Sequence, residues 1–272
     1  MCRFNYGLVS KTGYFWPAYG EQDEVCFAFF DSRQHGCVKA LLGDKLQDAS
    51  VLLSDGYAAY SRYAEATGVT HAQCWSHTRR GYFEALTAEP QAADQALKMI
   101  AKIYEVEADI RERALIGENK RLHRLEHAKP LVEAFFAWVD EQLARQGLLP
   151  SNALTKALVY ARERKSQLMV FLGDEQVPMD TNHLERALRP IPLGRKNWLF
   201  CWTEVGAQHD GIVQSLITTC KLHGVDPYNY FVDVLQRVGE HPAARVAELT
   251  PRLWKHHFAD SPLRSDLHRA AA

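Results

Sequence analysis

The sequence contains no long apolar run and no excess of charge of either sign. No stretch approaches the roughly 18 consecutive apolar residues of a membrane span, and the first residues lack the apolar core of a signal peptide. Lysine and arginine total 32 against 33 acidic residues, which leaves a net charge of −1. This balance argues against a general nucleic-acid binder, so any such site must come from a local patch. We expect a cytoplasmic protein with no membrane segment.

Motifs of several common enzyme classes are also missing. The chain has neither of the phosphate-binding patterns G-x-x-x-x-G-K-[ST] and G-x-G-x-x-G, and no G-x-S-x-G nucleophile elbow. Its 6 cysteines show no paired spacing, so we expect free thiols in a reducing compartment. The 272 residues, 47% of them hydrophobic and 24% charged, suffice for one large or two modest globular domains.

The first 85 residues alternate between strand-like and helix-like patterns. Two aromatic runs at 13–16 and 25–30, with a turn between them, predict a hairpin. Helix, buried strand, helix, strand and helix are then predicted at 37–46, 49–53, 57–67, 69–74 and 76–86, with Gly68 closing the middle helix. This order indicates an α/β fold with one partly parallel sheet.

A mostly helical pattern follows from residue 86 to 176. Apolar residues recur at helical spacing, and the charges between them alternate in sign, as on solvated helix faces. After Gly194, residues 195–202 resemble a strand, and helices are predicted at 211–223 and from Asp226-Pro227 to 238. The chain is therefore divided into segments 1–85, 86–176, 177–240 and 241–272.

Asp55 is the first carboxylate that the pattern singles out. It follows an apolar strand and precedes Gly56, and ligand or metal sites of α/β sheets gather beyond the carboxyl ends of strands. The alternative is that Asp55 only caps the helix that begins near Tyr57, because Asp-Gly is also common turn chemistry. The local pattern leaves both interpretations open.

Glu185 is the second such carboxylate. Asn182 and Glu185 fit a capping box, with Asn182 as N-cap and Glu185 three residues later. However, polar residues at spacing i, i+3, i+4 and i+7 share one helix face, and here they are Asn182, Glu185, Arg186 and Arg189. Leu184 and Leu188 lie on the other side, so the helix has an apolar support.

A basic and aromatic segment follows this glutamate. No acidic residue occurs from 186 to 203, whereas Arg195, Lys196 and Trp198 extend the positive charge of the helix and add an aromatic ring. An acid beside such a segment suits a site where metal ions meet a phosphate backbone. His71, Cys74 and His77 form H-x-x-C-x-x-H, but a zinc site needs a fourth ligand, and no second pair is evident.

Several separate blocks together carry a family resemblance. They are "SDGYAAY", "CWSHTRRGYFEAL", "NHLERALRPIPLGRKNWLF" and "GVDPYNYFVDVL". In this order, and over nearly the whole chain, they resemble the IS66 family of bacterial insertion-sequence transposases.

The resemblance implies a DDE transposase with an RNase H-like core, a mixed sheet with helices that a helical insertion interrupts. Three carboxylates would hold two divalent ions, Mg²⁺ or Mn²⁺, with Asp55 as the second acid and Glu185 as the third. DNA, both element ends and target, would be the partner, together with further copies of the chain and helper proteins of the element. The residues expected to contact DNA are Asn182, Arg186, Arg189, Arg195, Lys196 and Trp198. Cys74 and His77 match a C-x-x-H of related transposases and are candidates for a structural role.

The family's first catalytic aspartate has no counterpart here. No acidic residue precedes Trp16, and the expected aspartate would fall just before Met1. The resemblance therefore implies a chain cut within its catalytic core, without the first strand, with an open strand edge and little strand-transfer activity. Two alternatives remain: an RNase H-like nuclease that cuts without joining, and a non-catalytic remnant that binds DNA or oligomerises.

Overall fold

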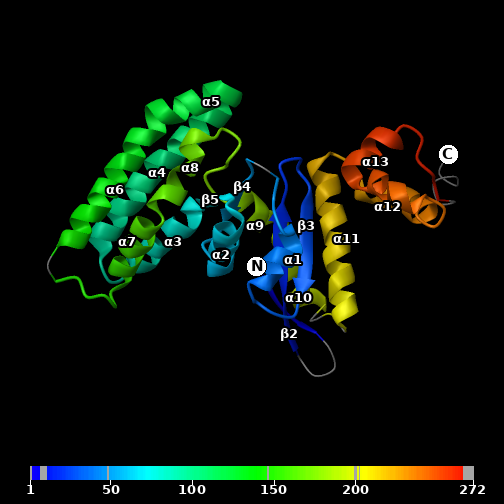
Figure 1. The fold of residues 1–272 in the computed structure, drawn as a ribbon, viewed down its shortest axis with the longest axis horizontal. Coiled ribbons are helices and arrows are strands. Elements are labelled where there is room, and N and C mark those ends of the chain that lie inside the picture. The colour runs from blue at the N-terminus through cyan, green and yellow to red at the C-terminus, as the bar shows by residue number, and fades with distance from the viewer. Residues whose placement is uncertain are drawn as a thin grey trace. The chain divides into compact units, whose positions relative to one another are not determined.

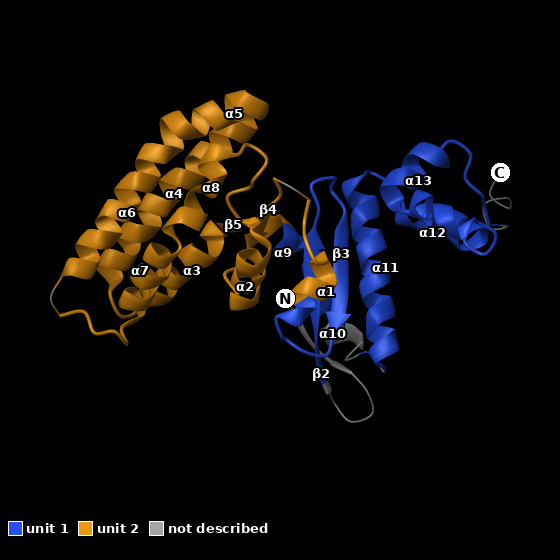
Figure 2. Ribbon diagram, in the orientation of Figure 1, with its two compact units in different colours: residues 1–37, 184–272 blue, residues 38–183 orange. Residues whose placement is uncertain are grey.

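The computed structural model describes residues 2–6, 11–47, 49–145, 147–198, 201 and 203–265 (Figure 1). It separates into two compact units, which are described one at a time. The first comprises Met1–Cys37 and Leu184–Ala272, and the second Val38–His183 (Figure 2). These divisions fall at other places than the sequence boundaries at 85, 176 and 240. The α/β class is confirmed, with helices in the majority.

The first unit is built on a three-stranded antiparallel sheet. Its strands follow chain order, β1 (Cys2–Tyr6), β2 (Lys11–Tyr19) and β3 (Val25–Phe30). The aromatic hairpin is thus confirmed, although β2 continues through Pro17 into the predicted turn. The chain reverses at Gly20, whose N–H donates to the Glu24 carbonyl at 2.9 Å.

β1 corrects one expectation from the sequence. We expected no strand before residue 13 and an open edge on the next strand. Instead β1 pairs with β2 from Cys2↔Phe15 to Tyr6↔Lys11, so ladder hydrogen bonds cover that edge. The sequence of β1, CRFNY, contains no aspartate or glutamate. A strand is therefore present at this edge, but it carries no acidic side chain.

Three helices accompany this sheet: α9 (Asn182–Leu188), α10 (Pro190–Trp198) and α11 (Glu204–Leu222). Leu188 of α9 and Ile191 of α10 are buried in one apolar cluster with Phe15 of β2. α10 shows that the strand predicted at 195–202 was wrong for residues 195–198. Pro190 begins this helix at its first position, and the burial of Ile191 against the sheet outweighs the local β preference of the segment.

α11 packs against the backbone of β3. The hydroxyl oxygens of Ser215 and Thr219 accept hydrogen bonds from the N–H groups of Phe27 and Val25, at 2.8 and 3.2 Å. A β-carbon on Gly211 would lie 2.3 Å from the Phe27 carbonyl oxygen, so only glycine allows this approach. Side-chain hydroxyls thus satisfy edge N–H groups of β3 that no fourth strand of the described sheet pairs with.

A small C-terminal core completes the first unit. It is formed by α12 (Pro227–Arg237), a 3-10 helix (Ala243–Leu249) and α13 (Pro251–His257). Asp226 caps α12 by accepting the Asn229 N–H at 2.8 Å, which confirms the Asp-Pro helix start. The buried Tyr230 hydroxyl donates to the Leu249 carbonyl at 2.7 Å and joins the elements.

The second unit contains a parallel strand pair. β4 (Val51–Ser54) and β5 (Thr70–Gln73) are connected by α2 (Ala58–Thr67), whose C-cap Gly68 has φ 73° as expected. α1 (Gly36–Leu42) precedes β4, and α3 (Trp75–Ala85) follows β5. One mixed sheet was predicted, but the described strands form two separate sheets, because ladder bonds join β4 only to β5.

Helices fill the stretch from 86 to 176. They are α4 (Pro90–Glu112), α5 (Gly117–His123), a π-helix (Arg124–Ala128), α6 (Lys129–Ala144), α7 (Ala153–Glu163) and α8 (Lys165–Gly173). The buried Trp75 lies among the rings of Phe135, Phe136 and Phe171, and its Nε1 donates to the Leu168 carbonyl at 2.8 Å. Within the described ranges, every helix is too short or too polar to span a lipid bilayer.

Candidate functional site

Asp55 lies directly beyond the carboxyl end of β4. Its Oδ1 accepts the Tyr57 N–H at 3.0 Å, so the turn interpretation of Asp-Gly is realised. The side chain is half-buried, and among the described residues its Oδ2 accepts no hydrogen bond. One carboxylate oxygen therefore shapes the turn, while the other is available to a ligand. The two interpretations of Asp55 are compatible.

A polar network surrounds this turn. The Tyr160 hydroxyl of α7 donates to the Asp55 carbonyl at 3.5 Å. The Ser54 hydroxyl and His71 Nε2 are 2.9 Å apart, and the Gln73 amide lies 3.4 Å from the same nitrogen. Tyr160 and Gln73 were missed by the sequence reasoning, because no local pattern links residue 160 to residue 55.

The network also shifts proton affinities. Burial and then the positive charge of Arg164 lower the pKa of His71, and Glu65 opposes them only in part. Burial and then the Asp55 carboxylate raise the pKa of Tyr60. His71 is therefore held neutral beside Ser54, and Tyr60 stays protonated.

Glu185 lies on the exposed face of α9. Glu185, Arg186 and Arg189 are exposed, whereas Leu184 packs against the apolar cluster and Leu188 is buried in it. The predicted exposure is thus confirmed for Glu185 and Arg186 on the helix, whereas Arg189 follows its end and Asn182 is half-buried. The helix ends at Leu188, directly before Arg189-Pro190, as the proline stop predicted.

The predicted capping box is not formed as expected. α9 begins at Asn182, and the Asn182 N–H, which a capping box would give to Glu185, donates to Asp180 Oδ1 at 3.0 Å. The Asn182 carboxamide also donates to Asp180 Oδ2, at 2.7 Å. Asp180 was not singled out from the sequence, although its D-x-N spacing is typical of such a turn.

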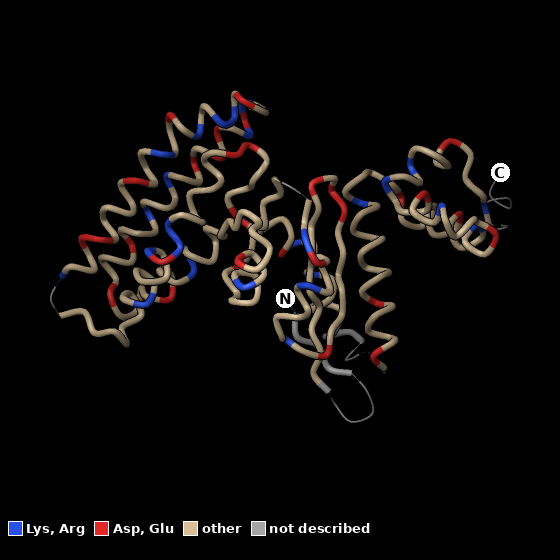
Figure 3. The backbone as a smooth tube through the Cα atoms, viewed as in Figure 1, with Lys and Arg blue, Asp and Glu red and all other residues tan. Residues whose placement is uncertain are grey.

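The other predicted DNA contacts are only partly visible. The backbone at Arg195, Lys196 and Trp198 belongs to α10, but their side chains lie outside the described residues, as does the whole of Trp202. In the second unit, both signs of charge alternate along the helices, as expected for solvated faces (Figure 3). The positive charge described near Glu185 thus comes from Arg186 and Arg189.

The two predicted metal ligands are in different compact units, Asp55 in Val38–His183 and Glu185 in Leu184–Ala272. Among the described residues, no group of three His, Cys, Asp or Glu side chains is arranged to hold a metal ion. Asp55 and Glu185 offer carboxylate oxygens, the type of ligand that Mg²⁺ prefers. These two carboxylates do not fit the three-carboxylate site that the resemblance implies.

Cys74 and His77 are placed at the start of α3. Cys74 is the N-cap and His77 the third helical residue, a spacing that brings the two side chains together. Burial alone would raise the pKa of the Cys74 thiol, but hydrogen bonds from His77 and Thr181 lower it. The H-x-x-C-x-x-H pattern thus runs from β5, which carries His71, into the start of α3, and none of its members lies in a three-ligand metal group among the residues described.

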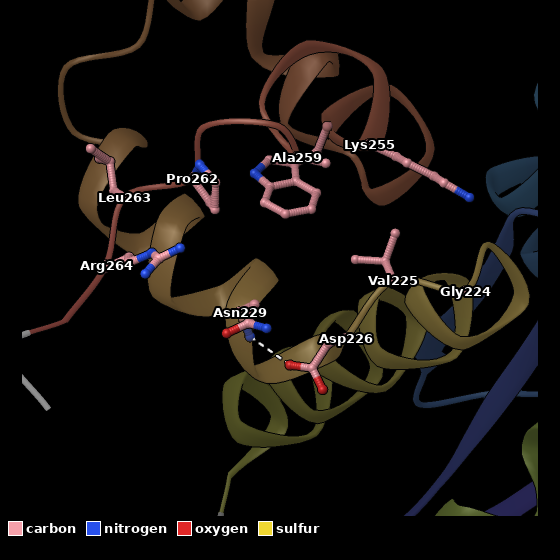
Figure 4. Close-up of a pocket in the computed structure, with 10 residues that line it drawn as sticks. Gly224, Val225, Asp226, Asn229, Lys255, Ala259, Pro262, Leu263 and Arg264 are labelled. Atoms are coloured by element: carbon pink, nitrogen blue, oxygen red, sulfur yellow. Dashed lines mark hydrogen bonds between the residues drawn. The ribbon is translucent and has the colours of Figure 1, made fainter. Parts of the chain in front are cut away.

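A pocket of about 420 Å³ opens in the C-terminal core of the first unit. Val225 and Asp226 line it from the start of α12, and Pro262 and Leu263 line it from the end of the described chain (Figure 4). Asp226 is engaged there as the cap of α12. The pocket contains none of the site residues predicted from the sequence.

Curated relatives of this chain occur in Sinorhizobium fredii. The uncharacterized protein y4hP is 32% identical over 222 residues, covering 75% of this chain and 40% of the relative. The uncharacterized protein y4qI is 29% identical over 236 residues, covering 84% of this chain and 42% of the relative. The chain thus spans about two fifths of the length of these relatives. No solved structure matches it.

Family models match most of the chain. The model described as the transposase IS66 family covers residues 8–209, and the IS66 C-terminal element covers residues 215–252. The first match includes Asp55, Cys74 and Glu185, and the second includes α12 and the 3-10 helix. The chain therefore belongs to the IS66 family of transposases.

Proposed function

We propose that this chain is the catalytic part of a DDE-type transposase with an RNase H-like core, and that Asp55 and Glu185 are two of its metal-binding carboxylates. The position of Asp55 carries the proposal. It lies beyond β4, the first strand of the parallel pair, with one carboxylate oxygen available to a ligand. Glu185 supports it from an exposed position on α9, a helix that Leu188 anchors in the apolar cluster.

The order of elements is compatible with an RNase H-like core. Three antiparallel strands are followed by a helix, a strand, a connecting helix and a second, parallel strand. Helices α4 to α8 then occupy the place of the insertion before the helix that bears Glu185. Membership of the IS66 family supplies the expectation that this arrangement acts on the DNA of an insertion sequence.

The incomplete set of carboxylates determines the activity we expect. Divalent metal ions in such sites activate a nucleophile and stabilise the leaving oxygen of a DNA strand. β1 carries no acidic residue, so Asp55 and Glu185 would bind Mg²⁺ or Mn²⁺ weakly by themselves. We therefore expect strand cleavage and joining by the chain to be slow.

DNA is the proposed partner. Arg186, beside Glu185 on α9, and Arg189, directly after this helix, are exposed, where they could position phosphate groups. Arg195, Lys196 and Trp198 belong to the same proposal on their sequence alone, with Trp198 as a stacking surface for a base. Action as a homo-oligomer with element ends, target DNA and helper proteins is part of this proposal.

The purified chain is tested on labelled element-end DNA with Mg²⁺ and then Mn²⁺. Slow cleavage that Asp55→Ala and Glu185→Ala each abolish supports the proposal. Asp140→Ala is the control, because Asp140 is an exposed carboxylate on α6. Cleavage that survives both substitutions would overturn the assignment of these residues.

Two further readouts separate the alternatives. Added target DNA that yields joined products favours a transposase, whereas cleavage without joining favours an RNase H-like nuclease. DNA binding without cleavage, indifferent to Asp55→Ala and Glu185→Ala, favours a non-catalytic remnant.

A further inference from the structure

Cys74 and Thr181 are bound to each other across 107 positions of sequence. The N–H and the hydroxyl of Thr181 both donate to Cys74 Sγ, each at 3.3 Å. Both residues are buried, with 1% and 7% of their surface exposed. The sulfur of Cys74 is thus the acceptor for two donors that have no access to water.

The residues around Thr181 are held to the same unit by further hydrogen bonds. The Trp75 N–H donates to the Met179 carbonyl at 3.2 Å. The Tyr104 hydroxyl donates to Asp180 Oδ2 at 2.9 Å. The segment 179–181 is therefore bound by α3 and α4 immediately before α9 begins at Asn182.

This segment is the connection between the helical region and the helix that bears Glu185. Asp180 links the segment to α9, because both of its carboxylate oxygens accept hydrogen bonds from Asn182, the first residue of that helix. Glu185 is three positions after Asn182, less than one helical turn. The position of the segment thus determines where the N-terminal turn of α9 starts.

We propose that Cys74 is a positioning residue, whose sulfur holds segment 179–181 and thereby fixes the start of α9 and the glutamate it carries. The consequence for catalysis rests on the proposed function of Glu185, whereas the tether itself does not. His77, at the third position of α3, also hydrogen-bonds the sulfur. The C-x-x-H spacing then serves to present a buried acceptor to a distant chain segment.

The size of sulfur explains why cysteine is needed. Alanine at position 74 would leave the Thr181 N–H and hydroxyl buried without their acceptor. Serine has a shorter bond from Cβ to its oxygen, so it would reach the two donors less well. Thr181→Val removes one donor and keeps the shape of the side chain, and Thr181→Ser keeps the hydroxyl.

Hydrogen exchange of the full chain tests the tether. Peptides that cover 179–185 are expected to exchange about ten-fold faster in Cys74→Ala, less so in Cys74→Ser and Thr181→Val, and as in the wild type in Thr181→Ser. Peptides from α6 should be unchanged. Cys220→Ala is the matched control, because Cys220 is also a buried thiol but lies in the C-terminal core.

Unchanged exchange rates at 179–185 in Cys74→Ala and Thr181→Val would overturn the proposal. An equal increase of the exchange rate in every peptide of the second unit would also overturn it, because that indicates global destabilisation. Thr181→Val keeps the test valid if Cys74→Ala fails to fold.

Mg²⁺-dependent cleavage is measured on the same variants. A drop in kcat with unchanged DNA affinity supports the role of Cys74 in positioning Glu185, and full activity despite faster exchange refutes it. If the wild type does not cleave DNA at all, the proposed function fails, while hydrogen exchange still decides the tether.

Discussion

A β-carbon at position 56 would lie 2.2 Å from the hydroxyl oxygen of Tyr160. Gly56 and Tyr160 come from different ends of the second unit's sequence, yet their contact closes the turn that carries Asp55. Gly56 also has φ 84°, a left-handed conformation that favours glycine. Glycine at position 56 is thus favoured both by the backbone of the turn and by its distant neighbour.

Gly56→Ala should destabilise the second unit. We expect a loss of about 2–3 kcal/mol in the free energy of unfolding, because the left-handed conformation and the contact with Tyr160 both penalise a β-carbon. Chemical denaturation followed by circular dichroism measures the loss. Tyr160→Phe in the same chain should restore part of it by removing the hydroxyl.

Gly68→Ala separates the cost of the left-handed backbone conformation from the cost of the contact with Tyr160. Gly68 has φ 73°, but a β-carbon there would meet no atom within 4 Å. Its substitution should cost only the backbone strain, about 1 kcal/mol. Equal losses for Gly56→Ala and Gly68→Ala would contradict a steric role of Tyr160.

Arg124→Met should be among the most damaging substitutions in the helical region. Arg124 is fully buried, and its guanidinium donates to both carboxylate oxygens of Glu107 at 2.8 and 2.9 Å. The same side chain donates to the carbonyls of Phe171, Asp174 and Val177. Its loss would leave a buried charge and three acceptors unpaired, at a cost of about 3–5 kcal/mol, measurable by urea denaturation.

Two further variants test this explanation. Arg124→Lys should rescue little, since one ammonium group does not reproduce the fork of donors. Arg121→Met, which removes the exposed ion pair with Glu118, should leave the unfolding midpoint nearly unchanged. A similar loss in both methionine variants would argue against burial as the cause.

Stability should decrease as the pH falls through the ordinary range of histidine. The pKa of His71 is lowered in the folded chain from its ordinary value of 6.5, first by burial and then by Arg164. Below about pH 6.5 the unfolded chain takes up a proton that the folded chain resists, so protonation favours unfolding; above it this effect is absent. Unfolding free energies measured from pH 8 to pH 5 should fall in that window, and His71→Gln should flatten the curve. A slope unchanged by His71→Gln would contradict this role.

Charge reversal at Arg195 and Lys196 should weaken DNA binding. If both side chains contact phosphates, replacing both by glutamate should reduce the steepness of the plot of log DNA-binding constant against log salt concentration by about 2. Fluorescence anisotropy with a labelled duplex at several salt concentrations gives this slope. Lys98→Glu with Lys102→Glu, on the exposed surface of α4, is the control for a general change of charge. An equal effect of both double variants would exclude a specific role of the segment.

Local signals predicted much of the fold. The aromatic runs correctly indicated β2 and β3, Gly68 the end of α2, and Asp226-Pro227 the start of α12. Each signal acts between residues close in sequence, through backbone conformation or capping. The element can therefore be predicted without knowledge of the tertiary structure. The exposed position of Glu185 was predicted for the same reason, since helical spacing alone groups it with other polar residues of the helix, away from Leu184.

The errors occurred where distant residues compete with local preference. Residues 195–198 are helical because Ile191 of the same helix is buried against the sheet, and Asn182 bonds Asp180 instead of Glu185 in a segment that α3 and α4 hold. β1 was missed for another reason: the family resemblance placed the first strand before Met1, although the pairing of β1 with the neighbouring β2 is local.

The sequence by itself determined the family, the α/β class and the two carboxylates worth testing, because these depend on residue types in order and on short spacings. Only the tertiary structure decided what surrounds them. The acceptor that Cys74 offers Thr181, the hydroxyl that Tyr160 places against Gly56 and the hydroxyls by which α11 covers β3 each join residues about a hundred positions apart or more. Such contacts depend on the tertiary packing of distant segments, which no local pattern of residues specifies.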